Sequence, residues 1–378
     1  MRILFLCGSL EPGKDGVGDY TRRLAGALRQ RGVETSLAAI RDRHVTRPPD
    51  PGGPDDTPPR IPAELPRKRR RALLEQVART VRPTHISLQF VPYAFARKGV
   101  PFFLARDLRL AAGDLDPVWH IMFHELWVGR GPDTGPGQSL LRHAQRAVVR
   151  DLLRQLRPAH VHTNLPESTE KLHALGADCR GLPLFSNIAA DAEIPDTAEA
   201  ESAANPGDGA FRIGLFSQFG PAPPLAEFAV DLAGALNLPV ELLLIGGNPA
   251  KSGAAERELR NALPETGFRV RATGFLDAGD ARKAIRGCQL GLTPVPRHAA
   301  GKSGSVAAFL TEGVPVAMPV VLAGRGADTV GFFHQRLSAA ILTRPTAAAL
   351  RAARAAAPAC HELISLASVA KRFLNDLA

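Results

Sequence analysis

Apolar residues form two alternating series along the chain, one in each half. In the first half, RILFLCG, HISLQFVPY, WHIMFHELW, AHVHTN and GLPLF are short, largely apolar runs, the pattern of strands covered on both faces of a parallel sheet. Helical spacing lies between them. Leu24 and Leu28 share one face of residues 19–31, and residues 67–81, RKRRRALLEQVARTV, have a similar apolar face. This order predicts βαβ units around a parallel sheet.

The second half repeats the alternation. FRIGLFSQFG, VELLLIGG, FRVRATGF, QLGLTPV and VPVAMPVV are predicted strands with helical stretches between them. Residues 188–209 are acidic, alanine-rich and aperiodic, which predicts a linker, and the prolines and glycines of residues 46–66 predict an exposed loop. The fold class is therefore α/β, with one doubly wound domain over 1–190 and a second over 208–360.

Composition and charge narrow the class of protein. With 378 residues, 45% of them hydrophobic and 22% charged, the chain is long enough for two ordinary globular domains. Its net charge of +10 favours anionic partners such as nucleotides, phosphorylated substrates, nucleic acid or an acidic membrane surface, although a solvated, arginine-rich surface gives the same number. Apolar runs are too short to cross a bilayer, and the first residues are too short for a secretory signal, so we expect a cytoplasmic protein.

Four cysteines are scattered along the chain without a CxxC spacing: Cys7, Cys179, Cys288 and Cys360. That spacing argues against both a zinc site and a disulfide framework. We expect all four to be small buried hydrophobic residues.

The stretch GKSGSVAAFLTEGVPV, residues 301–316, carries the main candidate chemistry. It begins like a phosphate-binding loop, but a Walker A motif requires a glycine where this chain has Pro296. Ser303-Gly304-Ser305 nevertheless precedes a predicted helix, whose first amides lack partners within the helix, and Lys302 adds a positive charge. These features suit a diphosphate. A serine N-cap on a core helix, with Lys302 solvated, explains the same residues.

The order of these pieces resembles the C-terminal domain of retaining glycosyltransferases with the two-Rossmann GT-B fold, most closely the large family commonly numbered four. The matching segments are LLLIGG, Thr273-Gly274-Phe275, a weakly polar strand, the stretch from Lys302 to Ser305, and GVPV. The resemblance spans nearly the whole chain. It implies two Rossmann-like domains facing a central cleft, with a closing helix at 361–378 that packs back on the N-terminal domain.

The resemblance also assigns residues to the donor. It implies that Gly16 and Gly18 lie over the donor diphosphate, that Thr273, Gly274 and Phe275 lie at the nucleotide base, and that Lys302, Ser303, Gly304 and Ser305 hold the diphosphate. The chain departs from the family at two positions. The family's pair of glutamates, eight positions apart, is replaced by Ala300 and Ala308, so Lys302, with Arg297 as a second candidate, has to neutralise the leaving group.

The predicted strands of the first domain end in further polar residues. His124 and Glu125 follow one strand, and by the resemblance His124 lies beside the donor sugar, while Glu125 either binds acceptor hydroxyls or acts as a base. A strand-end cap and a satisfied core histidine explain the pair equally simply. Gln89, Tyr93 and Trp127 are candidates for the acceptor side.

The function implied is transfer of a hexose from a nucleoside-diphosphate sugar to a hydroxyl of a saccharide, glycolipid or small-molecule acceptor, with retention, in bacterial polysaccharide or glycoconjugate biosynthesis. Because stabilising charge on the departing diphosphate is the main task, we expect no metal and no cofactor. A nucleotide-sugar epimerase of the same fold and a non-catalytic nucleotide-sugar-binding protein remain alternatives. A nicotinamide oxidoreductase is disfavoured, because the glycines after the first strand do not complete GxGxxG.

A second partner is suggested by the basic run Arg67–Arg71. Such a run can contact acidic lipid headgroups or form a solvated helix face. The expected location is thus cytoplasmic, with peripheral contact at the inner face of the membrane. We expect no nucleic-acid partner.

Overall fold

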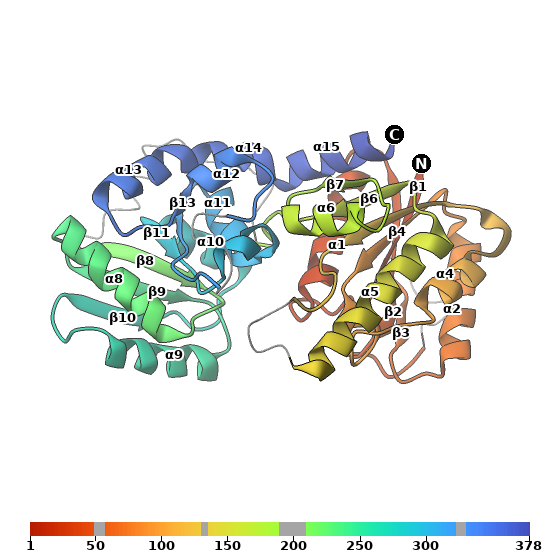
Figure 1. Cartoon of the computed structure of the whole chain (residues 1–378), viewed down its shortest axis with the longest axis horizontal. Coiled ribbons are helices and arrows are strands. Elements are labelled where there is room, and N and C mark those ends of the chain that lie inside the picture. The colour runs from red at the N-terminus through yellow and green to blue at the C-terminus, as the bar shows by residue number, and fades with distance from the viewer. Residues whose placement is uncertain (49–56, 130–134, 189–208, 323–329) are drawn as a thin grey trace. The chain divides into compact units, whose positions relative to one another are not determined.

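The computed structural model describes residues 1–48, 57–129, 135–188, 209–322 and 330–378 (Figure 1). These residues form two compact units. The first comprises Met1–Leu182 together with Ala370–Ala378, and the second comprises Pro183–Val369. Nearly all of the linker predicted at 188–209 lies outside the described residues, as does part of the loop predicted at 46–66.

The first unit is a parallel seven-stranded sheet in the order β3-β2-β1-β4-β5-β6-β7. Its strands are β1 (Arg2–Cys7), β2 (Glu34–Asp42), β3 (Arg60–Pro62), β4 (His85–Phe90), β5 (Val118–Phe123), β6 (His160–Thr163) and β7 (Cys179–Gly181). Its helices are α1 (Gly16–Arg29), α2 (Arg67–Val81), α3 (Pro92–Phe95), α4 (Leu104–Ala112), α5 (Pro136–Leu156) and α6 (Pro166–His173). The strands are apolar because helices cover both faces of the sheet.

The second unit is a parallel six-stranded sheet in the order β10-β9-β8-β11-β12-β13. Its strands are β8 (Phe211–Phe216), β9 (Val240–Ile245), β10 (Phe268–Ala272), β11 (Leu290–Leu292), β12 (Val316–Ala317) and β13 (Ile341–Leu342). Its helices are α8 (Ala222–Leu236), α9 (Pro249–Ala262), α10 (Ala278–Arg286), α11 (Gly304–Thr311), α12 (Gln335–Ala339), α13 (Ala347–Ala356) and α14 (Cys360–Ile364), and α15 (Leu366–Leu377) follows.

Most predicted elements are present, and their differences have local causes. α1 begins at Gly16 rather than at residue 19 because the Asp15 side chain caps it, accepting from the amides of Val17 and Gly18. GLPLF, residues 181–185, is not a strand beyond its first residue, because β7 ends at Gly181. β3 lies within the segment predicted as a loop. The predicted helix at 361–378 is two helices, broken at Ser365.

Buried residues match the predicted faces. Leu24 and Leu28 are fully buried on α1, and all four cysteines are buried and free, as predicted. In the second unit, Phe309 of α11 packs across two strand glycines. A Cβ on Gly291 of β11 would meet its ring at 2.6 Å, and one on Gly214 of β8 would meet it at 3.1 Å. These glycines let α11 lie close against the two central strands.

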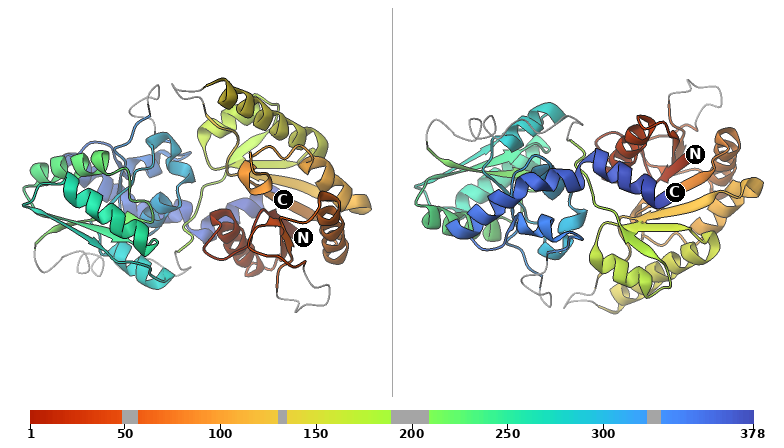
Figure 2. Two further views of the ribbon diagram at one scale, coloured as in Figure 1. Left: turned by 90° about the horizontal axis from the view of Figure 1, so that it is seen from below. Right: turned by 90° about the horizontal axis from the view of Figure 1, so that it is seen from above.

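The C-terminal end of the chain packs on the first unit. Phe373 of α15 is fully buried, and its ring centroid lies 5.9 Å from that of Phe5 in β1. Both chain ends therefore lie next to the same sheet (Figure 2).

Candidate functional site

Each sheet has one point where its strand order reverses. In the first unit the chain runs outward from β1 to β3 and returns to β4 on the other side, and in the second it returns from β10 to β11 beside β8. Open parallel sheets bind ligands outside the carboxyl ends of the strands at such points. The predicted site residues follow β1, β4 and β5 in the first unit, and β10 and β11 in the second.

Gly16 and Gly18, the residues predicted to lie over the donor diphosphate, are in the first turn of α1, just after the loop that follows β1. The first amides of α1 already bond the Asp15 carboxylate, at 3.0 Å from Val17 N and 2.8 Å from Gly18 N. Packing alone also explains why residue 18 is a glycine, since a Cβ there would lie 2.4 Å from the carbonyl oxygen of Ser9. Gly16 is exposed and has open space around its Cα. Donor binding by the two glycines remains a prediction, and a bound diphosphate would have to approach beside a carboxylate.

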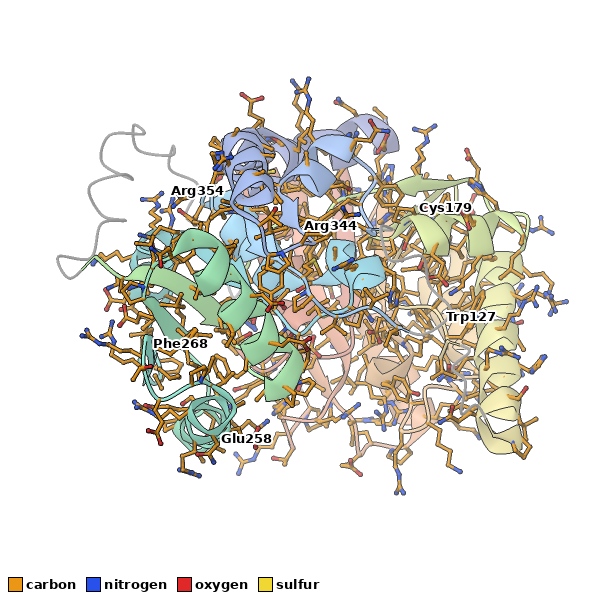
Figure 3. The ribbon with its side chains drawn as sticks, turned by 60° about the vertical axis from the view of Figure 1, so that its left-hand side comes forward. Trp127, Cys179, Glu258, Phe268, Arg344 and Arg354 are labelled. Atoms are coloured by element: carbon orange, nitrogen blue, oxygen red, sulfur yellow. The ribbon has the colours of Figure 1, made fainter. Side chains whose placement is uncertain are left out.

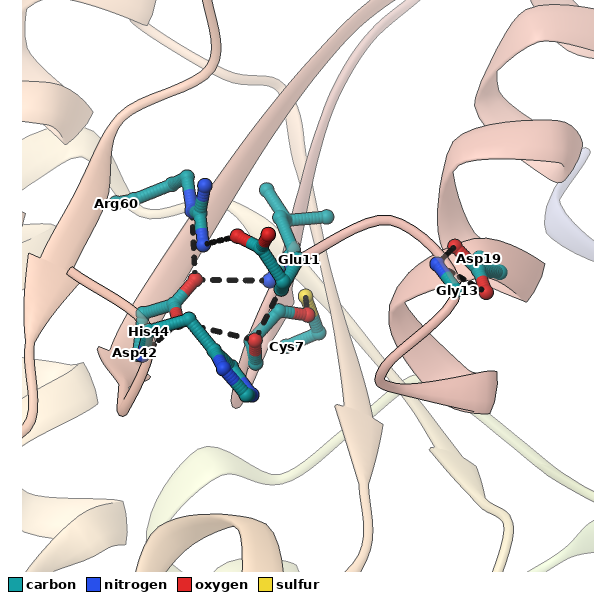
Figure 4. Close-up of polar contacts among 9 residues, drawn as sticks. Cys7, Glu11, Gly13, Asp19, Asp42, His44 and Arg60 are labelled. Carbon is teal, nitrogen blue, oxygen red and sulfur yellow. Dashed lines mark hydrogen bonds and ion pairs between the residues drawn. The ribbon is translucent and has the colours of Figure 1, made fainter. Parts of the chain in front are cut away.

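Asp42, at the end of β2, holds the loop after β1 in place (Figure 4). Its buried carboxylate accepts hydrogen bonds from Ser9 Oγ at 3.0 Å, from the Leu10 amide at 3.0 Å, from the His44 amide at 2.9 Å and from Arg60 Nε at 2.7 Å. Burial by itself raises the pKa of the Asp42 carboxyl, but the hydrogen bonds from Arg60, the two amides and Ser9 outweigh it and hold the pKa at about 2.

We expect the Asp42 carboxylate to stabilise the first unit while it is ionised and to lose this effect at strongly acidic pH. Its folded pKa lies below the ordinary value of 3.8, so its contribution is complete above about pH 4 and is lost as the pH falls towards about 2. The full contribution is roughly 2–3 kcal/mol in the free energy of unfolding. Urea unfolding across this range should show Asp42→Asn losing that part of the pH slope, whereas the exposed control Asp114→Asn should retain it. Equal slopes for all three proteins would contradict the assignment.

His124 follows β5 and is buried, with 6% of its surface exposed. Its Nε2 lies 2.9 Å from Gln89 Oε1, while Gln89 Nε2 donates to Ser87 Oγ at 2.8 Å. Because the Gln89 amide nitrogen is committed to Ser87, its oxygen faces His124 and accepts from Nε2–H. Burial lowers the pKa of His124 to about 3, so the ring is neutral near pH 7. The ring of Tyr20 meets it edge-on, with centroids 5.0 Å apart.

The same hydrogen bonds continue across the sheet to the C-terminal helix. Ser87 Oγ lies 2.8 Å from His120 Nδ1, His120 Nε2 lies 3.0 Å from His162 Nδ1, and His162 Nε2 lies 3.0 Å from Asp376 Oδ2. The Asp376 carboxylate can only accept, which makes His162 Nε2 the donor and His162 Nδ1 the acceptor for His120. We call this series the polar chain; its members are His124, Gln89, Ser87, His120, His162 and Asp376.

The polar chain has one consistent direction. Every donor points from His124 towards Asp376: His124 donates through Nε2 to Gln89, and His120 accepts from Ser87 at Nδ1 and donates through Nε2 to His162. The arrangement fixes His124 as the Nε2–H tautomer, with Nδ1 as its acceptor. Polar residues at alternate positions of β4 and β5, such as Ser87 and Gln89, were the sequence signal for this chain, but we considered only Gln89 and His124.

The other first-unit candidates lie on the segments after β4 and β5. Glu125 and Tyr93 are exposed. Trp127 is half-buried between β5 and α5 (Figure 3), with Lys171 Nζ 5.9 Å from its ring centroid. Gln145, on α5, joins the two segments. Its Oε1 accepts from the Val128 amide at 2.9 Å, and its Nε2 donates to the Lys98 carbonyl at 3.3 Å. The structure thus joins His124 directly to Gln89; it shows no such bond to Tyr93 or Trp127 among the described residues.

In the second unit, the predicted diphosphate site is the start of α11. A short segment after β11 is followed by a 3-10 turn, Arg297–Lys302, which leads through Ser303 into this helix. Ser303 and Ser305 are buried; Ser303 Oγ caps the helix by accepting from the Val306 amide at 3.3 Å and lies 2.9 Å from Ser305 Oγ. Lys302 and Gly304 are exposed. Ser303 is thus an N-cap, as one of the two explanations of the sequence requires, and anion binding at Lys302 and Gly304 stays a prediction.

Arg297 is a buried structural residue. Its Nε donates to the Met318 carbonyl and its Nη2 to the Thr343 carbonyl, each at 2.7 Å. These bonds hold the chain after β12 and β13 in place, so the exposed Lys302 is a better candidate than Arg297 for neutralising a leaving diphosphate. Ala300 and Ala308, which occupy the places of the family's glutamates, are each 1% exposed and belong to an apolar cluster.

The predicted base-binding segment follows β10. Thr273 Oγ1 accepts from the Gly246 amide at 3.0 Å, which joins this segment to the end of β9. Gly274 has a φ of +71°, a conformation that favours glycine. Phe275 is 81% exposed. An aromatic side chain held in water at the carboxyl edge of a sheet offers a stacking surface for a base.

Neither a metal-binding cluster nor a membrane-spanning helix is present among the described residues. No group of three or more His, Cys, Asp or Glu residues is arranged to hold a metal ion. No helix in the described ranges has the length and apolar character needed to cross a membrane.

Comparisons with known proteins now decide the fold. No family model and no curated protein matches the sequence. Among solved structures, sucrose-phosphate synthase from Thermosynechococcus elongatus is similar with a TM-score of 0.61 and 17% identity, covering 99% of this chain and 98% of that one. HepE from Anabaena, solved with UDP-glucose, has a TM-score of 0.54 and 16% identity over 100% and 99% of the two chains. A putative UDP-N-acetylglucosamine 2-epimerase from Listeria monocytogenes has a TM-score of 0.52 and 13% identity over 99% and 94%.

The chain has the GT-B fold. The predicted fold class, two parallel α/β domains, is therefore confirmed. Its neighbours include both glycosyltransferases and an epimerase, so the fold is compatible with the two enzyme classes considered from the sequence.

Proposed function

We propose that the protein transfers a hexose from a nucleoside-diphosphate sugar to a hydroxyl acceptor, with retention and without a metal or other cofactor. The observation that carries the proposal is the start of α11. It follows β11 at the strand-order reversal of the second unit, with Lys302 and Gly304 exposed there. Helix amides and one cation suit a diphosphate, and stabilising a departing diphosphate is the main requirement of retaining transfer. A UDP-sugar donor is supported by the structural neighbour HepE, which was solved in complex with UDP-glucose.

His124 is proposed to act as a hydrogen-bonding residue at the sugar. Its pKa of about 3 makes it an unsuitable general acid near pH 7, but its Nδ1 can accept a hydrogen bond from a sugar hydroxyl. Glu125, exposed beside it, is the proposed acceptor-side carboxylate. An epimerase needs groups that move protons on the sugar ring, and a neutral histidine and one carboxylate provide less for that task than for transfer.

The proposed acceptor and biological setting follow from the same resemblance. The acceptor is a saccharide, glycolipid or small molecule, and the setting is bacterial polysaccharide or glycoconjugate biosynthesis in the cytoplasm. A non-catalytic nucleotide-sugar-binding protein is the second candidate, because alanines replace both family glutamates.

The test measures donor binding and turnover separately. The purified protein is titrated with UDP-glucose, UDP-N-acetylglucosamine and GDP-mannose, and sugar release or transfer is followed with EDTA present. His124→Ala should lower kcat by about 10- to 100-fold with a smaller change in donor affinity, the effect of one hydrogen bond made mainly in the transition state. The exposed control His143→Ala should behave like the wild type. Donor binding without release or transfer would favour the non-catalytic protein, and a C2-inverted sugar nucleotide as product would favour an epimerase.

A further inference from the structure

A cavity of about 220 Å³ in the first unit is lined by arginines. It lies between the end of β2, the start of α2 and the segment leading into α4. The cationic lining consists of Arg41, Arg67, Arg70 and Arg71. Its apolar lining includes Ile40, Leu74, Phe95 and Leu108. The cavity is therefore both cationic and apolar.

The charges in this cavity are poorly balanced. Asp107 is the acidic lining residue, so four positive charges and one negative charge leave a formal charge of +3. Asp107 is already used by Arg67, at 2.6 and 2.9 Å, and lies 3.9 Å from Arg71. Arg70 Nη1 donates to the carbonyls of Ala63 and Leu65.

Arg41 is the lining arginine with an unsatisfied hydrogen-bond donor. Its Nη1 atom is buried and has no hydrogen-bond partner among the described residues. Burial lowers the pKa of the Arg41 guanidinium, and neighbouring Arg43 lowers it further, although Glu64 acts in the opposite direction. Burial, followed by repulsion from Arg41, also lowers the pKa of Arg70. An anion in the cavity would supply the missing acceptor and relieve this repulsion.

Two exposed aromatic residues stand at the rim. Phe102 is 57% exposed and Phe103 is 54% exposed, and the guanidinium carbon of Arg67 lies 3.9 Å from the centroid of the Phe103 ring. Further exposed cations flank this pair in the sequence; they are Arg97, Lys98, Arg106 and Arg109. Adjacent exposed aromatic side chains surrounded by cations are typical of segments that enter the interface of an acidic bilayer.

We propose that this cavity and its aromatic rim dock the protein on an acidic phospholipid bilayer, with the phosphate of one lipid among the arginines and Phe102 and Phe103 in the interfacial layer. A soluble anion would use the arginines alone and would gain nothing from the exposed rings. The proposed surface differs from the run Arg67–Arg71 expected from the sequence, since Lys68 and Arg69 do not line the cavity and Arg41 does. It is independent of sugar transfer, because bilayer binding needs neither donor nor acceptor.

The experiment is vesicle co-sedimentation of the full chain. Vesicles of phosphatidylcholine alone are compared with vesicles that also contain phosphatidylglycerol, at low and high salt. We expect binding only to the acidic vesicles, and weaker binding at high salt. Arg41→Gln should weaken it by about fivefold, equivalent to about 1 kcal/mol per basic residue. Phe102→Ser combined with Phe103→Ser should weaken it by about tenfold or more.

Matched controls separate the proposed surface from general charge and hydrophobicity. Arg79→Gln removes an exposed arginine of α2, the helix that contributes three arginines to the cavity, and Leu140→Ser removes an exposed apolar side chain of α5. Both should bind like the wild type. Equal binding to the two kinds of vesicle would overturn the proposal, as would equal loss in the control variants. Thermal stabilisation by inorganic phosphate without any vesicle binding would also overturn it, and would identify the cavity as a site for a free anion. Because Phe102 and Phe103 are exposed, we expect their double variant to fold like the wild type, so weaker vesicle binding by this variant would not reflect unfolding.

Discussion

Replacing Lys302 with alanine is expected to slow sugar transfer by roughly 30- to 1000-fold, equivalent to about 2–4 kcal/mol in the barrier. The side chain is exposed just before the N-terminus of α11. This helix follows β11, one of the two strands between which the strand order reverses. Negative charge grows on a diphosphate as the sugar leaves, so an ammonium in the proposed position would stabilise the transition state more than the bound donor. We therefore expect a fall in kcat, together with weaker binding of the free nucleoside diphosphate.

The controls distinguish charge at this position from charge in general. Lys302→Arg retains the cation and should lose less activity than Lys302→Ala. Lys283→Ala removes an exposed lysine of α10, which pairs with Asp280 at 3.1 Å, and should leave both kcat and nucleotide affinity unchanged. Calorimetry with UDP and GDP measures the affinity. Unchanged affinity and turnover in Lys302→Ala would disprove the diphosphate site, even if the protein proved to be a glycosyltransferase.

Strands in the middle of the sheets were predictable because their environment fixes their composition. β1 and β9 are covered on both faces, so nearly every position is apolar and the segment is recognised without neighbours. β3 was missed because it lies at an edge, contains a proline and pairs only with β2. Such a short edge strand forms only by pairing with its neighbour, so its sequence has little strand-like hydrophobic pattern.

The candidate site was predictable only where one segment carries it. Gly301–Val316 combines turn, cap and helix in sixteen consecutive residues, and these residues were singled out from the sequence alone. In the structure Ser303 of this stretch is used as a cap, and Arg297, just before it, is bonded to two carbonyls. A sequence states which polar groups are present, but only their neighbours determine which are already satisfied.

The polar chain could not be predicted for a different reason. His120 and His162 come from neighbouring strands, and Asp376 comes from α15, which is 214 positions beyond His162. Buried polar side chains at alternate strand positions were visible, but their partners are set by sheet register and by the docking of the last helix. The same limit applies to Arg41, whose cavity is formed by three separate segments.

Replacing His162 with alanine is expected to lower the free energy of unfolding by about 2–4 kcal/mol. The side chain is 1% exposed, and its loss removes the acceptor for His120 Nε2–H, removes a donor to Asp376 and leaves a cavity beside the buried ring of Phe373. Arg180 still reaches Asp376, at 3.1 Å, so the carboxylate keeps one partner while the buried His120 donor keeps none in that direction. The loss of stability in His162→Ala should therefore appear both as a lower urea midpoint and as faster amide hydrogen exchange in α15.

A glutamine at this position tests whether hydrogen bonding or volume is responsible. His162→Gln can accept from His120 and donate to Asp376 in the same direction as the histidine, so it should be more stable than His162→Leu, which fills similar space without polar atoms. His143→Ala, on the exposed face of α5, is the control and should leave stability unchanged. Equal destabilisation by glutamine and leucine would mean that packing alone holds α15 to the sheet. The polar chain would then orient His124 without contributing to the attachment of the C-terminal helix.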